Sequence, residues 1–313
     1  MNIREKKISE IISYLESIKH PGSEHLYPIQ ENIKFFNSIT SFKSFYKWIK
    51  KEAPFINKDK VCELTELGSS LYDKELHESL IKLERGFVPG FIDPLVKKVT
   101  SLIKKSNSPL LIADLGSGSA ELTRQIIQNV LKKKNLQPLT IVAFDNSEVS
   151  QLIAQRNLSC FNESIDIVKK GKLNESDFLI LIKNHKKPVK VILCSNDIFN
   201  IENDFENIHF NIIYHSFFKH HLNKAQKIKI DGIIKKKSEI ALEYDGYHSL
   251  SGATIQAFFV WKNPVLLSGA IFSNLRYYSK QELKKFSKDS KVYIYRFGKL
   301  LFYRGTYMRI VNK

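Results

Sequence analysis

The sequence predicts an α/β fold: a mostly parallel sheet with an antiparallel C-terminal strand, preceded by a mainly helical N-terminal region. Three observations predict it. A buried-strand pattern runs directly into a glycine turn and a helical pattern over residues 110–131. Further apolar runs alternate with helical patterns as far as residue 245, and such alternation is typical of parallel sheets. Two runs with strand alternation then follow a late helical segment near the end of the chain.

The first 85 residues carry a mainly helical pattern. Apolar residues recur at helical spacing over residues 4–19, and the aromatic-rich stretch Ile33–Ile49 predicts another helical segment. Val61–Leu71 reads as a short strand running into a helix. Its Leu64-Thr65-x-x-Gly68 segment resembles the end of a winged-helix module. The region is therefore expected to be either helical or winged-helix-like.

Residues 86–95 are the predicted linker between two domains. Two glycines and two prolines fall within this short stretch, and both residue types favour turns over regular structure. We therefore expect an N-terminal domain over residues 1–85 and a second domain over residues 86–313. A helix from about Val96 to Lys105 should begin the second domain.

The first predicted strand, Leu110–Leu115, carries an acid and ends in a run of small residues. Asp114 is followed by Gly116, Gly118 and Ala120 at alternate positions, and a helical pattern begins at once. Glycines allow backbone angles closed to other residues, and they let a ligand lie against bare backbone at the positive end of a helix. The acid offers a fixed hydrogen-bond acceptor beside the turn, so the pattern favours a ligand site over a plain strand-to-helix turn.

The second predicted strand, Leu139–Asp145, also ends in an acid. In nucleotide-binding α/β folds, an acid at this place accepts hydrogen bonds from the ribose hydroxyls. Asp145 suits that role. The alternative is a turn aspartate that caps the helix after Ser147.

The remaining apolar runs complete the alternating order. They predict a third strand over Val189–Leu193, a fourth over Phe210–Tyr214 and a fifth over Ser238–Asp245. Residues 148–187 are more than the basic unit needs, so we expect an insertion there. A short helix over residues 281–286 then precedes the final strand pair.

Together these motifs resemble the class I S-adenosylmethionine (SAM) dependent methyltransferases, whose first motif reads acidic-x-Gly-x-Gly-x-Gly. Here it reads Asp114-x-Gly116-x-Gly118-x-Ala120, with alanine in place of the third glycine. The pattern Gly-x-Gly-x-x-Gly of nicotinamide-binding dehydrogenases fits less well, because Glu121 stands at its last position. The resemblance covers about residues 105–313 and implies a Rossmann-like fold with SAM as cofactor.

The resemblance also implies roles for individual residues. Asp114 would orient the methionine end of SAM, and Gly116, Ser117 and Gly118 would line it with backbone. Asp145 would hold the ribose. A polar residue after the third strand would meet the adenine, and Asp197, with Asn196 as substitute, stands there.

The fourth strand is followed by a Phe-Phe-Lys-His-His-Leu segment that resembles the fourth motif region of the family, although Asn211 replaces its more common aspartate. By resemblance to small-molecule O-methyltransferases, His220 would be the general base; in other members this histidine only packs. The substrate region is expected near the ends of the strands, at His215, Tyr244, Asp245 and His248. The spacing of these groups gives no reason to expect a bound metal.

Composition bears on the binding partners, the disulfide content and the location of the protein. The formal net charge is +17, which is expected of a protein that binds nucleic acid. However, the chain is rich in lysine, asparagine and isoleucine, and its lysines are distributed along the whole sequence. This pattern also indicates a compositional bias without a functional role for the charge. The three cysteines are far apart, which argues against a disulfide framework. The apolar window Ala253–Leu275 is broken by Lys262-Asn263-Pro264, so no membrane span and a cytoplasmic location are expected.

The sequence therefore predicts a SAM-dependent methyltransferase that modifies an O or N nucleophile, with a small-molecule acceptor favoured. One alternative is an RNA, DNA or protein methyltransferase that uses the basic surface. Another is a non-catalytic binding protein that keeps the fold, which the Ala120 and Asn211 departures allow. The sequence leaves open the acceptor, the methylated atom and the oligomeric state.

Overall fold

The computed structural model describes residues 2–19, 26–58, 60–67, 70–82, 92–133, 135–184, 186–249, 253–254, 257–258, 260–286, 289–296 and 305–312. The chain divides into two compact units. The sheet unit comprises His77–Asp245, Lys285–Tyr293 and Tyr307–Lys313. The helical unit comprises Met1–Leu76, Gly246–Lys284 and Ile294–Thr306. In the sequence, its segments therefore come both before and after the main segment of the sheet unit.

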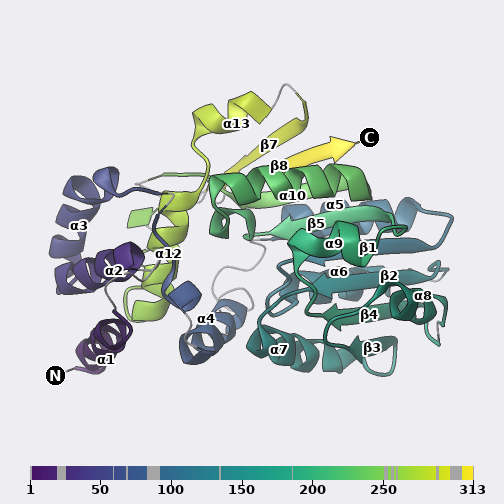
Figure 1. Cartoon of the computed structure of the whole chain (residues 1–313), viewed down its shortest axis with the longest axis horizontal. Coiled ribbons are helices and arrows are strands. Elements are labelled where there is room, and N and C mark those ends of the chain that lie inside the picture. The colour runs from purple at the N-terminus through teal and green to yellow at the C-terminus, as the bar shows by residue number, and fades with distance from the viewer. Residues whose placement is uncertain are drawn as a thin grey trace. The chain divides into compact units, whose positions relative to one another are not determined.

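A single mixed sheet has the strand order β3-β4-β2-β1-β5-β6-β8-β7 (Figure 1). The strands are β1 (Leu110–Leu115), β2 (Leu139–Phe144), β3 (Ile165–Lys169), β4 (Val189–Cys194), β5 (Phe210–Ser216), β6 (Ser238–Gly246), β7 (Lys291–Arg296) and β8 (Gly305–Asn312). The strands from β3 to β6 pair in parallel, and the C-terminal strand is antiparallel. The middle strands are apolar on both faces, as strands covered by helices on both sides must be.

Helices cover both faces of the sheet. Those of the sheet unit are α5 (Asp93–Lys105), α6 (Glu121–Val130), α7 (Glu148–Leu158), α8 (Glu175–Lys183), α9 (Ile201–Asp204) and α10 (Lys224–Lys237), and the boundary between the units falls within α4 (Ser70–Lys82) and α13 (Lys280–Phe286). Phe178 of α8, Phe205 directly after α9 and Ile233 of α10 share one apolar core with Ala113 and Ile213 of the sheet. The opposite face carries Asp114 and Tyr214. The Asp114 carboxylate and the Tyr214 hydroxyl each lie within hydrogen-bonding distance of the Thr123 hydroxyl on α6.

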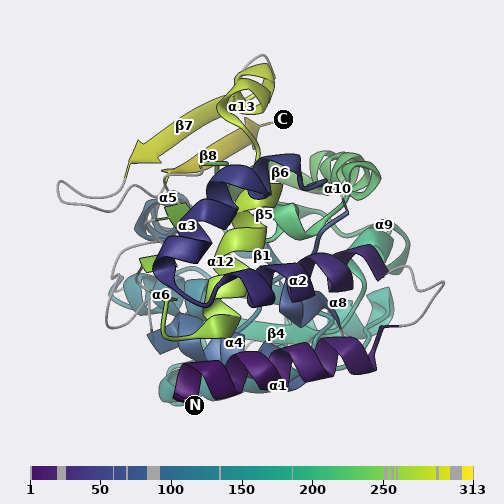
Figure 2. The same ribbon diagram turned by 90° about the vertical axis from the view of Figure 1, so that its left-hand side faces the viewer.

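The helical unit has its own core. It contains α1 (Ile3–Ser17), α2 (Leu26–Ser38), α3 (Phe42–Lys51) and α12 (Pro264–Arg276), with short 3₁₀ turns at Ala53–Phe55 and Leu64–Leu67. Figure 2 shows α12 crossed by the N-terminal helices. Phe35 packs edge-on against Phe272, with ring centroids 5.4 Å apart. Burial of α12 therefore depends on helices from the other end of the chain.

The predicted fold class is confirmed, with local corrections. The stretch Ile33–Ile49 is not one helix, because α2 ends at Ser38 and Ser41 caps α3 by accepting a hydrogen bond from the Ser44 N–H at 3.1 Å. Val61–Glu63 forms no strand, so the N-terminal region follows the helical alternative. The stretch 148–187 holds an additional edge strand, β3, with α7 and α8 on either side of it in sequence.

The two-domain division at residues 86–95 stays a prediction, since residues 83–91 lie outside the described part of the chain. None of the described helices has the length and apolar character needed to cross a lipid bilayer.

Candidate active site

The order of the sheet reverses at β1, which lies between β2 on one side and β5 on the other. In open α/β sheets, ligands bind outside the carboxyl ends of the strands at such a reversal. The turn after β1 lies at this place, and so does the Phe217–Phe218 segment after β5. Most of the predicted site residues follow the carboxyl ends of these strands and of β2, β4 and β6.

The turn after β1 has a backbone that favours glycine. Gly116 and Gly118 have φ of 65° and 53°, and Ala120 adopts the same left-handed conformation with φ of 54°. Glycine adopts this conformation more easily than other residues, and Ala120 keeps it in spite of its side chain. A Cβ added at Gly116 would lie 2.3 Å from the Phe218 ring, so this position excludes any side chain.

Asp145 joins the end of β2 to the glycine turn. Its Oδ2 accepts a hydrogen bond from the Gly118 N–H at 2.8 Å, and its Oδ1 accepts one from the Ser147 N–H at 2.9 Å. The Ser117 N–H donates to the Phe144 carbonyl at 3.0 Å. The acid that was predicted to hold a ribose is therefore fixed beside the bare backbone of the turn.

Asp114 points in a different direction, into the protein. It is 2% exposed, and its Oδ2 accepts a hydrogen bond from the Thr123 hydroxyl at 2.7 Å, while the Tyr214 hydroxyl lies 2.7 Å from the same Thr123 oxygen. Burial raises the pKa of Asp114 to about 7, in spite of the hydrogen bonds from Thr123 and Tyr214, which lower it. Its predicted role at the methionine end stays a prediction.

Asn196 and Asp197, after β4, have distinct surroundings. The Asn196 amide exchanges hydrogen bonds of 2.8 Å with the backbone N–H and carbonyl of Leu173, and it donates to Asp204 at 2.7 Å. It thereby holds the segment before α8 in place. Asp197 is exposed, and its Oδ1 accepts a hydrogen bond from the Phe199 N–H at 2.9 Å. Of the two, Asp197 presents its carboxylate to solvent.

His220 and Asp245 form a buried pair at the ends of β5 and β6. His220 lies in the 3₁₀ turn Lys219–His221, and its Nδ1 is 3.1 Å from both carboxylate oxygens of Asp245. The His220 backbone N–H also donates to Asp245 at 3.3 Å. A carboxylate on Nδ1 fixes the proton there and leaves Nε2 as the basic nitrogen.

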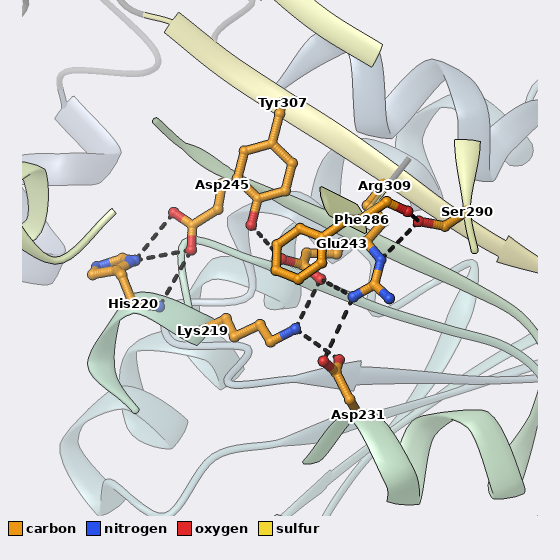
Figure 3. A network of polar contacts seen from close by, with 9 residues as sticks. All are labelled: Lys219, His220, Asp231, Glu243, Asp245, Phe286, Ser290, Tyr307 and Arg309. Atoms are coloured by element: carbon orange, nitrogen blue, oxygen red, sulfur yellow. Dashed lines mark hydrogen bonds and ion pairs between the residues drawn. The ribbon is translucent and has the colours of Figure 1, made fainter. Parts of the chain in front are cut away.

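Lys219 holds the same turn from the interior (Figure 3). Its ammonium group is fully buried and lies 2.7 Å from Asp231 of α10 and 3.0 Å from Glu243 of β6. Glu243 also pairs with Arg309 and accepts a hydrogen bond from Tyr307, both on β8. Burial alone would raise the pKa of Glu243, but the positive charges of Lys219 and Arg309 lower it to about 2. No local pattern in the sequence predicts this network, because its members come from four separate segments.

The predicted substrate residues have different surroundings. His215 lies in β5 on the face toward α10, and the buried Tyr244 packs its ring edge-on against Phe217. Asp245 pairs with His220, as described above. His248 belongs to the helical unit, where its Nδ1 lies 2.9 Å from the Asn274 carbonyl oxygen.

His77 was not predicted from the sequence. Its Nε2 lies 2.9 Å from the Ser150 hydroxyl of α7, and a Cβ added at Gly118 would be 2.9 Å from its Cε1. A lone histidine in a helical pattern carries no spacing signal, so only the fold brings it to the glycine turn.

No protein-family model matches the sequence, and neither does any curated protein. Similar solved structures include the methyltransferase domain of bacterial CtHen1, at 13% identity and a TM-score of 0.43, covering 70% of this chain and 97% of that one. Another is the magnesium protoporphyrin IX methyltransferase ChlM from Synechocystis PCC 6803 with bound SAH, at 12% identity and a TM-score of 0.44, covering 77% of this chain and 98% of that one. A third is the plantazolicin methyltransferase BpumL in complex with a triazolic desmethylPZN analogue and SAH, at 13% identity and a TM-score of 0.46, covering 78% of this chain and 97% of that one.

The strand order and the turn after β1 establish the fold independently of these similarities. It is a Rossmann-like α/β fold with an antiparallel C-terminal strand. Relative to the order implied by the sequence motifs, the fold carries one addition, the edge strand β3.

Proposed function

We propose that this chain is a SAM-dependent methyltransferase that transfers the methyl group to an oxygen or nitrogen nucleophile of a small molecule. The observation that carries the proposal is the bond between Asp145 and the Gly118 N–H. It brings a carboxylate suited to two ribose hydroxyls next to a turn whose backbone is bare. Both oxygens of Asp145 also accept hydrogen bonds from backbone N–H groups, so the carboxylate is held in place beside the turn.

The residues present fit the cofactor. Gly116 and Gly118 present backbone without side chains, and the rings of Phe218 and His77 pack against these two positions. Asp145 would hold the ribose, and the exposed Asp197 would meet the adenine amino group. Asn196 would act indirectly, since its amide is engaged by Leu173 and Asp204.

SAM supplies a methyl group on a good leaving group, so the protein chiefly has to hold the two partners in line. A base is needed only where the nucleophile must lose a proton. His220 would accept this proton at Nε2, while Asp245 holds the ring and stabilises the charge that forms. This dyad supports a phenol-like or similar proton-bearing acceptor.

The first test is calorimetric titration of the full chain with SAM, with NAD as the control ligand. We expect micromolar SAM binding and no NAD binding. Asp145→Ala should weaken SAM binding about ten- to hundred-fold, because a hydrogen-bonded charge is lost. Asp177→Ala removes an exposed aspartate of α8 and should leave the affinity unchanged. Equal SAM affinity of the Asp145 variant and the wild type would contradict the cofactor assignment.

The acceptor class is tested by methyl transfer from labelled SAM to phenols, amines and bulk RNA at several salt concentrations. Transfer to a small molecule that changes little with salt is the expected result. Transfer to RNA alone, with affinity that falls steeply as salt rises, would instead establish the basic surface as the acceptor site. SAM binding without transfer to any acceptor would favour a binding protein that has kept the fold.

A further inference from the structure

The neighbouring strands β4, β2 and β1 begin level with one another at the amino edge of the sheet. The register pairs Leu110 with Leu139 and Leu139 with Val189, which are the first residues of the three strands. A proline precedes each of them, and the Leu110 and Leu139 N–H groups donate to the carbonyls of Pro138 and Pro188 at 3.0 and 2.9 Å. The segments that enter these strands therefore lie side by side, at the end of the sheet opposite to the proposed SAM site.

These three entering segments are strongly basic. We call residues 104–109, 132–138 and 183–188 the basic edge. Their described residues include no aspartate, glutamate or arginine. They include seven lysines, which are exposed or half-buried: Lys104, Lys105, Lys132, Lys133, Lys183, Lys186 and Lys187. Lysines that are far apart in the sequence are thus brought to one surface by the strand order.

The two half-buried lysines are held at this edge by backbone carbonyls. The Lys133 ammonium group donates to the carbonyl of Lys104 at 2.8 Å and so joins the segment after α6 to the end of α5. The Lys187 ammonium group donates to the carbonyl of Ile165 at 3.2 Å. Neither bond neutralises its lysine, so both positive charges stay at the basic edge.

The helix dipole accounts for only part of this pattern. Lysines are favoured near the C-termini of helices, and Lys105 and Lys183 are the last residues of α5 and α8. The dipole does not explain why acids are absent between them. Acids return in the segments that enter the strands on either side, with Glu163 before β3 and Glu206 before β5. The basic edge is therefore a bounded surface and not a sample of the average composition.

The chemistry of the basic edge suits a phosphate backbone. The lysine ammonium is a compact point charge, and a DNA duplex offers one negative charge per about 1.7 Å of its axis. Single strands are commonly bound by stacking of bases on aromatic rings, and no phenylalanine, tyrosine or tryptophan belongs to the basic edge. Membrane surfaces are commonly bound by exposed apolar residues, whereas Leu136 of the basic edge is half-buried. A duplex therefore fits better than a single strand or a membrane.

We propose that the basic edge binds the phosphate backbone of a double-stranded nucleic acid without sequence preference. The proposal is independent of the proposed methyl transfer, because the SAM site uses the carboxyl ends of the strands. A duplex on the amino edge would be bound without being presented to that site. A small-molecule acceptor and a nucleic-acid partner are therefore compatible in one chain.

The test is fluorescence anisotropy of a labelled DNA duplex of about 20 base pairs, titrated with the full chain at several KCl concentrations. Contacts to three to seven phosphates predict a slope of log affinity against log salt of about −3 to −6. A duplex of unrelated sequence should bind equally well, and a single strand should bind more weakly. Affinity that does not depend on salt, or tighter binding of the single strand, would overturn the proposal.

Matched variants locate the binding. The triple variant Lys104→Gln, Lys132→Gln and Lys183→Gln should weaken duplex binding at least about ten-fold and make the slope shallower by about 2 to 3. The control removes three exposed lysines near the carboxyl ends of the strands, which lie after β3 and at the start of α10: Lys170→Gln, Lys172→Gln and Lys224→Gln. Because it loses the same charge, it isolates the effect of position. Its affinity should stay within about three-fold of the wild type.

The remaining outcomes assign the charge differently. Equal weakening in the two triple variants would mean that the duplex responds to net charge alone. Loss of binding only in the control variant would place the duplex at the carboxyl edge, beside the SAM site. Binding to phosphatidylserine-containing vesicles but not to the duplex would assign the basic edge to a membrane surface. Each of these three results would overturn the proposal, and a urea midpoint for each variant shows that it is folded.

Discussion

At the scale of the residue, Asp114 shows how a motif position can serve the fold. The sequence correctly places it in a buried strand before the glycine turn. The structure shows its carboxylate hydrogen-bonded to Thr123 and buried beneath α6. Thr123 gave no signal in the sequence, because a threonine in the first turns of an amphipathic helix is unremarkable until the fold places an acid opposite it.

The raised pKa of Asp114 makes the stability depend on pH. The native state keeps a proton that the unfolded chain releases between the ordinary pKa of 3.8 and about 7. The free energy of unfolding of the wild type should therefore fall as pH rises through this window, by up to about 4 kcal/mol, and then stay level. Asp114→Asn lacks this ionisation, so its stability relative to the wild type should increase from pH 4 to pH 7 and not beyond.

Urea unfolding of both proteins at several pH values measures that difference. Asp177→Asn, at an exposed position, is the control and should show no such rise. A difference between Asp114→Asn and the wild type that does not change with pH would mean that the Asp114 carboxyl is ionised in the native state.

His220 is the second residue whose role can be separated from folding. His220→Ala should lower kcat for a proton-bearing acceptor by about 10²- to 10⁴-fold, because the general base is lost. SAM affinity should not change, since His220 lies at the ends of β5 and β6 and not at the glycine turn. Single-turnover transfer and calorimetry together measure the two effects; an unaltered kcat would assign His220 to packing.

At the scale of the element, most of the sheet could be predicted because apolar runs that end in acids or glycines are local signals. The predicted strands at 110–115, 189–193 and 238–245 lie within the observed β1, β4 and β6 or coincide with them. β3 could not be found in this way. Only Ile165 of this edge strand is fully buried, so its sequence has no continuous apolar run.

In the site, too, only the residues with a local sequence signal could be predicted. Asp145 and the glycine turn follow from local sequence, whereas the Lys219–Glu243 pair joins a 3₁₀ turn to a strand that lies after the next helix. No local pattern announces a lysine that folding will bury completely. The position of His77 beside Gly118 was hidden for the same reason.

The buried ion pair yields a prediction for the turn Lys219–His221. Lys219→Met should lower the free energy of unfolding by about 3–5 kcal/mol, because Glu243 loses a close partner in the interior. Lys236 of α10 is an exposed partner of Glu202, so Lys236→Met should lower the free energy of unfolding by less than about 1 kcal/mol. Urea midpoints compare the two variants, and equal losses would mean that the Lys219 pair contributes no more than a surface contact.

At the scale of the whole molecule, the helical unit is assembled from distant parts of the chain. The Ser268 hydroxyl of α12 donates to the Asn32 side chain of α2 at 3.2 Å. The sequence predicted helices at both ends of the chain, but helical periodicity does not say which apolar faces will meet. The expected division at residues 86–95 was based on composition alone.

A fragment over residues 86–313 tests that division directly. It would lack the helices that cover α12, so Leu267, Ile271 and Phe272 would become exposed. We expect this fragment to bind a hydrophobic dye strongly and to lose cooperative unfolding of the α12 region, while the full chain does neither. A fragment that unfolds cooperatively and binds no dye would establish residues 86–313 as an independent domain.

The separation of α2 from α12 also has a consequence for synthesis. The two helices are joined by a hydrogen bond across 236 residues. At about 5–20 residues per second, a ribosome needs roughly ten to fifty seconds to make the chain between them. During that time the aromatic faces of α2 and α3 have left the ribosome without their partner. Chaperone demand during translation should therefore be concentrated on the first fifty residues, and it should end only when α12 emerges.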